Sequence, residues 1–261
     1  MDEKSSTDRS SGLPFHEPSH VPPSEDRIRY HTVRTEVNAF LGEFIGTFMF
    51  LSMSFAGTQI ALNAAGTSEL TADDKPDVAK LLYIAFVFGA SLAVNVAIFA
   101  DISGGKFNPA VTTALLVTGK IHWHRALQTI VSQMIAGIAA AGFVSGVLPG
   151  PLIIATVLDA SMSITRGFFL EAFVTSQLVL TILMMEGGSA KPAYIGFALF
   201  VSELSCVFFT GGSLNPARSF GPACIVGFTG YHWIYWIGPL LGSLVASGEY
   251  YLINFIRKGT I

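Results

Sequence analysis

The stretch SGGKFNPA at residues 103–110 returns as TGGSLNPA at residues 210–217, and this repeated stretch decides the fold. Each copy carries a glycine pair and then, two residues later, the tripeptide Asn-Pro-Ala. Asn is a favoured helix N-cap and Pro suits the first helical position, so each copy predicts a loop that leads into a helix. One polar loop placed twice in an apolar chain indicates a pore built from two halves.

Composition places these loops in a lipid bilayer. The chain is 51% hydrophobic and 13% charged, and its mean hydropathy is +0.55, which is outside the range of soluble domains. The net charge is -3 and no run of Lys or Arg occurs, so a nucleic-acid partner is excluded, since phosphate binding needs a concentrated basic surface.

Apolar stretches long enough to cross a hydrocarbon core of ~30 Å recur from Val37 onward. Two shorter apolar segments, 108–118 and 215–227, run on from the Asn-Pro-Ala motifs, and each is counted from the Asn. At ~1.5 Å per residue each spans about half a membrane. We therefore expect an all-α membrane protein with six transmembrane helices and two re-entrant half-helices. The predicted spans are 38–62, 81–100, 126–148, 167–186, 193–210 and 232–256.

The chain divides into a polar tail and a channel domain. Residues 1–36 are rich in Ser, Pro and charged residues, and we expect them to form a disordered cytoplasmic tail. The channel domain is expected over 37–256, with halves at about 37–148 and 167–256, and 257–261 form a short C-terminal end. The positive-inside rule predicts that both termini are cytoplasmic. The basic residues that support this orientation are Arg27, Arg29, Arg34, Lys120, Arg125, Lys191, Arg257 and Lys258.

The two halves match at a second position. Glu43 and Glu171 each precede a Thr by four residues, in EFIGT and EAFVT. Three spans per half give the halves opposite membrane orientations, which is an inverted repeat. We expect both carboxylates to accept hydrogen bonds from the backbone of the re-entrant loops. An ion or proton relay is the alternative for glutamates at membrane depth.

The motif residues themselves predict the chemistry of the pore. Gly104, Gly105, Gly211 and Gly212 let backbone carbonyls turn toward a water-filled path and form a ladder of acceptors. The Asn side chains become paired donors at the pore centre, where two helix N-termini meet and disfavour cations and hydronium. The central motifs comprise Asn108, Pro109, Ala110, Asn215, Pro216 and Ala217.

With the doubled motif and the run NPARSFGP at 215–222, the chain resembles aquaporins of the major intrinsic protein family over about residues 37–256. The resemblance implies a homotetramer with one pore in each subunit and passive transport driven by osmosis. It also implies a narrow filter formed by Phe88, Glu203, Gly212 and Arg218. The polar tail and the long first external loop resemble fungal members.

Glu203 departs from the family pattern. Water-selective relatives usually have His at this place and glycerol-conducting ones a smaller residue. One hypothesis pairs Glu203 with Arg218 across the pore and predicts a permeability that depends on pH; the other places Glu203 away from the pore, bonded to backbone or helix neighbours. Ser219 and Ala223 stand where glycerol-conducting members have Asp and Lys, which favours water.

These observations predict a passive water channel that excludes protons and ions. Hydrogen peroxide and glycerol remain alternative solutes, and a secondary transporter or an adhesive membrane protein remain alternatives from other classes. No metal-ligand spacing, phosphate-binding glycine motif or nucleophile elbow occurs in the sequence, so we expect no enzyme activity, metal or cofactor. The expected partners are water, small neutral solutes, the lipid bilayer and further copies of the chain. The plasma membrane is the default location, and an internal membrane is the alternative.

Overall fold

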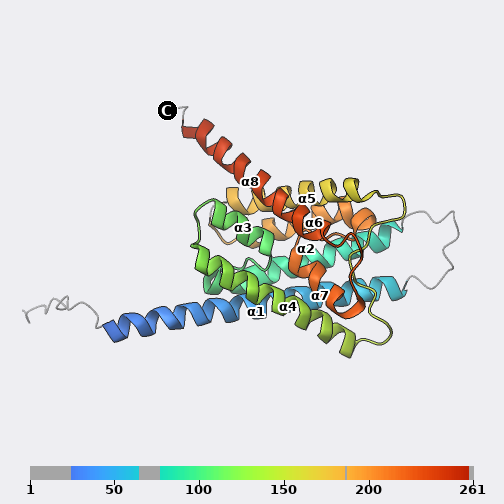
Figure 1. The fold of residues 1–261 in the computed structure, drawn as a ribbon, viewed down its shortest axis with the longest axis horizontal. Helices are drawn as coiled ribbons and strands as arrows, with labels where there is room; N and C mark the ends of the chain where they lie inside the picture. The colour runs from blue at the N-terminus through green and yellow to red at the C-terminus, as the bar shows by residue number, and fades with distance from the viewer. Residues whose placement is uncertain (1–24, 65–76, 186, 259–261) are drawn as a thin grey trace, which may run out of the picture.

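The computed structural model describes residues 25–64, 77–185 and 187–258, and every regular element within them is a helix. Six helices are long and two, α3 and α7, are short (Figure 1). This architecture confirms the predicted all-α fold with two half-helices. The helices are α1 (Glu25–Ala64), α2 (Val78–Ser103), α3 (Pro109–Val117), α4 (Trp123–Val147), α5 (Ile164–Met184), α6 (Lys191–Thr210), α7 (Pro216–Val226) and α8 (Ile234–Lys258).

Helix contacts repeat between the two halves. In the first half α1 packs against α2 and α4, and in the second half α5 packs in the same way against α6 and α8. The short helices cross over between halves, because α3 packs against α8 and α7 packs against α4. In the ribbon α3 and α7 are drawn between α8 and α4 (Figure 1), in agreement with these contacts. The halves therefore interlock around the two motifs.

Glycines permit the closest of these crossings. A Cβ at Gly89 would lie 2.6 Å from the carbonyl oxygen of Gly196, and a Cβ at Gly137 would lie 2.5 Å from that of Ala217. Contacts this short admit no side chain, so the backbones of α2 and α6, and of α4 and α7, meet directly. The short helix α7 is thereby held against α4.

The outer faces of the long helices suit a lipid environment. Large apolar side chains such as Phe86, Phe173 and Phe197 are exposed, as expected where lipid replaces water. Among the described residues, five helices are long and apolar enough to cross a membrane: α1 from Val33, α2, α4, α5 and α6. The sixth long helix, α8, has 25 residues but carries Glu249, Arg257 and Lys258 and is not among the five.

The expected N-terminal boundary needs a correction. Helix α1 begins at Glu25, so 25–36 are helical rather than part of a disordered tail. The physical reason is that Glu and Arg are good helix formers, and an acidic pair at the start favours the helix N-terminus. Arg125 of α4 also donates to the Glu36 carboxylate at 2.7 Å, which ties this part of α1 to the bundle. The rest of the predicted tail, 1–24, lies outside the described residues.

Both helices at the chain ends project from the same end of the bundle (Figure 1). We call this the termini end. Helix α6 starts at the termini end and finishes at the opposite end, next to the segment 148–163 that joins α4 and α5. Chain ends on the same side of the bundle agree with an even number of long helices, since each one takes the chain from one end to the other.

Candidate functional site

The two Asn-Pro-Ala loops meet in the middle of the bundle and bond to each other. Nδ2 of Asn108 donates to the carbonyl of Leu214, and Nδ2 of Asn215 donates to the carbonyl of Phe107, both at 2.8 Å. Each amide nitrogen carries two hydrogens, so one donor of each Asn remains after this exchange. The exchange places the two motifs face to face.

Local sequence explains how each Asn is aimed. The side-chain oxygen of Asn108 accepts from the backbone N–H of Ala110 at 2.8 Å, and that of Asn215 accepts from Ala217 at 3.0 Å and Arg218 at 3.4 Å. Both asparagines are helix N-caps and both are followed by Pro at the first helical position. The cap holds the side-chain oxygen and leaves the amide group free to reach the other loop.

The two loops have similar backbone conformations, with φ angles that differ by 20° or less at the matching positions. The φ angles of the glycine pairs are 100° and 59° in the first loop and 80° and 63° in the second. Phe107 and Leu214 also have positive φ, at 51° and 50°, which is uncommon for residues with a side chain. The carbonyls of Phe107 and Leu214 are the acceptors for the opposite asparagines, so this backbone turns them toward the centre.

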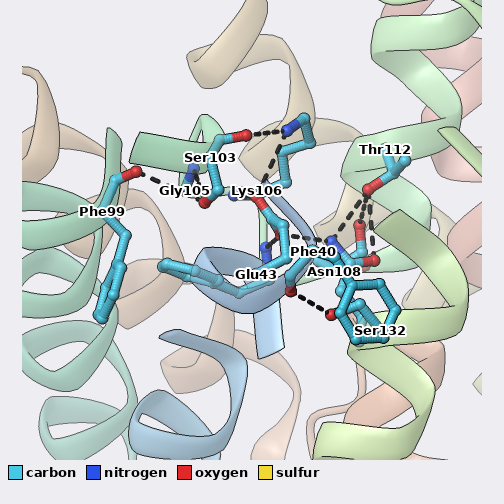
Figure 2. A network of polar contacts seen from close by, with 11 residues as sticks. Phe40, Glu43, Phe99, Ser103, Gly105, Lys106, Asn108, Thr112 and Ser132 are labelled. Atoms are coloured by element: carbon cyan, nitrogen blue, oxygen red, sulfur yellow. Dashed lines mark hydrogen bonds and ion pairs between the residues drawn. The ribbon is translucent and has the colours of Figure 1, made fainter. Parts of the chain in front are cut away.

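Glu43 holds the first loop (Figure 2). Its carboxylate accepts from the backbone N–H groups of Lys106 at 3.1 Å and Phe107 at 3.0 Å. It also accepts from Nε2 of Gln133 at 2.8 Å and forms an ion pair with Nζ of Lys106 at 3.3 Å. The carboxylate is fully buried, and these four donors replace the water it would otherwise need.

Glu171 holds the second loop in the same way. Its carboxylate accepts from the backbone N–H groups of Ser213 at 3.0 Å and Leu214 at 2.9 Å. The third donor is the hydroxyl of Thr210 at 2.6 Å, where the first loop uses a lysine and a glutamine. The backbone contacts therefore follow the repeat, and the side-chain contacts differ between the halves.

A central cavity runs along the two asparagines. Its volume is about 20 Å³, which is room for about one water. Three of the four predicted filter residues line it, and Gly212 does not. Its lining includes Phe88, Lys106, Asn108, Glu203, Asn215 and Arg218.

Arg218 is fixed in this wall by backbone carbonyls. Nη1 donates to Ile154 at 2.9 Å and Nη2 donates to Gly211 at 3.0 Å. The guanidinium also lies over the rings of Phe88 and Phe55, at 5.1 and 5.7 Å from the centroids. Its Nε is buried without a hydrogen-bond partner among the described atoms. Of the predicted carbonyl ladder, Gly211 is thus engaged by Arg218.

Glu203 matches neither hypothesis in full. It lies in the cavity wall, yet among the described ion pairs there is none with Arg218. Both carboxylate oxygens are buried without a partner among the described residues, so it is not bonded to backbone or helix neighbours either. The carboxylate lies over Gly212, where any Cβ would overlap it.

Sequence reasoning missed three contributors to the site. Lys106 lies inside the repeated stretch and could have been noticed as a charge at membrane depth. Gln133 and Ile154 gave no such signal, because a glutamine in a helix and a carbonyl in a loop have no distinctive pattern. Both reach the site only through contacts between residues far apart in the chain.

Comparisons with known proteins give matches in sequence over most of the chain. The family model described as Major intrinsic protein matches residues 30–250. The chain is 46% identical to Aquaporin-7 of Botryotinia fuckeliana over 88% of this chain and 52% of that protein. It is 48% identical to Aquaporin-2 of the same organism, over 86% of this chain and 61% of that protein. It is 43% identical to Aquaporin-1 of Gibberella zeae, over 91% of this chain and 74% of that protein. The chain thus spans half to three fifths of the length of the first two relatives.

A solved structure shares the fold. The aquaglyceroporin from Plasmodium falciparum superposes with a TM-score of 0.71 at 23% identity, covering 82% of this chain and 95% of that chain. At this identity the likeness concerns the arrangement of the helices alone.

Proposed function

The chain belongs to the major intrinsic protein family, with fungal aquaporins as relatives. Members of this family are membrane channels rather than enzymes. From this premise we propose that the chain conducts water passively. The observation that carries the proposal is the narrow central cavity beside Asn108, Asn215 and Arg218. A cavity of about 20 Å³ favours water over larger solutes, because it holds about one water at a time.

Exclusion of protons and ions follows from the same groups. The N-termini of α3 and α7 meet at the two asparagines, so the positive ends of two helix dipoles point at the cavity. Arg218 adds a fixed positive charge. Water can accept from the remaining amide hydrogens of the asparagines, whereas hydronium and metal cations are repelled.

The filter role of Phe88, Glu203 and Arg218 is part of this proposal. Gly212 contributes indirectly, since its missing side chain leaves the space that the Glu203 carboxylate occupies. We further propose that the termini end is cytoplasmic, that the protein resides in the plasma membrane and that it assembles as a homotetramer. Glu43 and Glu171 support the loops in this scheme and do not relay protons.

Other small neutral solutes are the second candidate. What supports this candidate is the side chain of Glu203, which fills the space over Gly212 and whose carboxylate has no hydrogen-bond partner among the described residues. Rearrangement of this side chain would widen the cavity at this point and admit a solute larger than water.

Stopped-flow light scattering of proteoliposomes tests the proposal. A water channel gives rapid shrinkage under an impermeant osmolyte, with a low activation energy and a linear dependence on the gradient. Under a glycerol or peroxide gradient, fast re-swelling would assign the second candidate instead. Saturable, gradient-coupled flux would indicate a transporter, and unchanged vesicle permeability would indicate an adhesive role.

A further inference from the structure

Lys106 lies where three cavities meet. It lines the central cavity, a wider vestibule of about 680 Å³ at the termini end, and an adjoining side cavity of about 440 Å³. Lys106 is nevertheless 92% buried, with 8% of its surface exposed. A charged side chain at this depth is costly unless its surroundings are built to hold it.

The surroundings of the Lys106 ammonium provide it with partners and with space. Nζ donates to the carbonyl of Ser103 at 2.6 Å and pairs with Glu43 at 3.3 Å, as Figure 2 shows. A Cβ at Gly104 would lie 2.7 Å from Nζ, so a glycine there leaves the space for the ammonium. Two of the three ammonium hydrogens are thereby used, and one remains.

The ion pair has a direction. Lys106 lines all three cavities, whereas Glu43, which is fully buried on α1, lines none of the three. The carboxylate is also shared among the backbone of Lys106 and Phe107 and the amide of Gln133. The positive member therefore faces the conducting path and the negative member faces away from it.

This charge is not the repeat partner of Arg218. In the repeated stretch Ser213 stands at the place of Lys106, and Val111 stands at the place of Arg218. Lys106 nevertheless lies on the termini side of the asparagine pair, while Arg218 is held from the opposite side by Ile154 and Gly211. The path thus meets one buried cation before the asparagines and another after them.

We propose that Lys106 is a second charged side chain that bars cations from the pore, placed at the termini end and independent of Arg218. This inference rests on the proposed function. In a cavity with few waters a fixed ammonium repels hydronium and metal cations, while neutral water can accept its remaining hydrogen. Among the other charges that line these cavities, the vestibule contains Asp101 with Lys120 and Lys191, and the central cavity contains Glu203 with Arg218. Acidic groups therefore do not outnumber basic ones around Lys106. In the side cavity Glu36 is paired with Arg125, beside His122 and His124.

Two barriers in series predict a non-additive pattern of leaks. With either charged side chain removed, the other one still limits cation flux together with the helix dipoles at the asparagines, so Lys106→Gln and Arg218→Val should each leak little. With both removed, the leak should exceed that of either single variant by roughly tenfold or more. Arginine at position 106 keeps the charge, so Lys106→Arg combined with Arg218→Val should leak no more than Arg218→Val alone.

The experiment measures sodium and proton entry into proteoliposomes, each divided by the osmotic water permeability of the same preparation. Lys120→Gln, alone and combined with Arg218→Val, is the matched control, because Lys120 lines the vestibule and side cavity and not the central cavity. The inference is overturned if Lys106→Gln combined with Arg218→Val leaks no more than Arg218→Val alone. It is also overturned if Lys120→Gln combined with Arg218→Val leaks as much as the Lys106→Gln combination. If Lys106→Gln fails to fold, the comparison between Lys106→Met and Lys106→Arg decides, each combined with Arg218→Val. If the unaltered protein shows no osmotic water permeability, the proposed function is refuted instead. This outcome is distinguishable because water permeability is measured apart from sodium and proton entry.

Discussion

The carboxylate of Glu203 occupies the space that a side chain at position 212 would fill, so Glu203 and Gly212 form one steric unit. Gly212 itself has φ of 63°, a conformation that favours glycine. The small residue at 212 therefore does not widen the pore, because the room it leaves is taken by a residue from α6. Size and charge at this point of the path are set by the pair.

Gly212→Ala should lower both stability and water flux. The new Cβ would overlap the Glu203 carboxylate and adopt an unfavourable φ, and overpacking alone costs about 1–3 kcal/mol. Thermal unfolding in detergent and stopped-flow shrinkage measure the two effects. Adding Glu203→Ser should restore the stability lost to the overlap with the carboxylate. The loss caused by the unfavourable φ at position 212 should remain. Gly142→Ala is the control, since a Cβ there would lie within 4 Å of no atom outside its chain neighbours and its own helix backbone. Equal losses at both glycines would contradict the steric unit.

Glu203→Gln should remove a dependence of water flux on pH. Glu203 lines the cavity and its carboxylate has no partner among the described residues, so a change in its protonation changes the charge beside the path that conducted water takes. Glutamine has a similar shape and does not titrate. Stopped-flow measurements from mildly acidic to neutral pH compare the two proteins. Flux that stays constant across this range in the unaltered protein would place the carboxylate outside the conduction path.

Glu43→Gln should destabilise the fold more than Glu171→Gln. In both variants an amide group faces a backbone donor, which costs about 1–3 kcal/mol. Glu43→Gln also leaves the buried Lys106 ammonium without its counter-charge, and breaking a buried ion pair costs about 3–5 kcal/mol.

Unfolding of the purified variants measures this ranking. Glu36→Gln is the control, because the Glu36–Arg125 pair is partly exposed and contributes about 1 kcal/mol or less. Should Glu171→Gln prove the more damaging variant, the ion pair would have no net stabilising role.

Ser161→Ala should raise the pKa of Asp159, in the segment between α4 and α5. The hydroxyl and the backbone N–H of Ser161 donate to the Asp159 carboxylate at 2.5 and 2.9 Å and hold its pKa below the ordinary value. A lowered folded-state pKa means that the stabilisation is present at neutral pH and is lost as the pH falls through that pKa. The variant should therefore show less acid-dependent loss of stability.

Carboxyl NMR titration of Asp159 in detergent checks this shift. Ser163→Ala is the matched control, since Ser163 caps α5 through the N–H of Arg166. The attribution fails if both serine variants move the Asp159 titration equally.

The sequence was a good guide wherever local backbone chemistry decides the structure. Asn followed by Pro starts a helix, and paired glycines accept left-handed backbone, so the predicted half-helices, 108–118 and 215–227, match α3 and α7 to within one residue at each end. Helical propensity of charged residues was underestimated, and α1 consequently begins earlier than expected. The positions of Glu43 and Glu171 followed from the repeat, which makes them equivalent by symmetry.

By itself, then, the sequence determined the membrane setting, the inverted repeat and the residues at the meeting point of the loops, because hydrophobic length, capping and turn preferences act over a few neighbouring residues. Only the tertiary structure decided how Lys106 pairs with Glu43, which carbonyl receives Arg218, and that Glu203 fills the space over Gly212. These contacts join residues far apart in the chain, and their geometry depends on how closely the helices approach. Helix approach is set by packing of the whole bundle, which no short motif encodes.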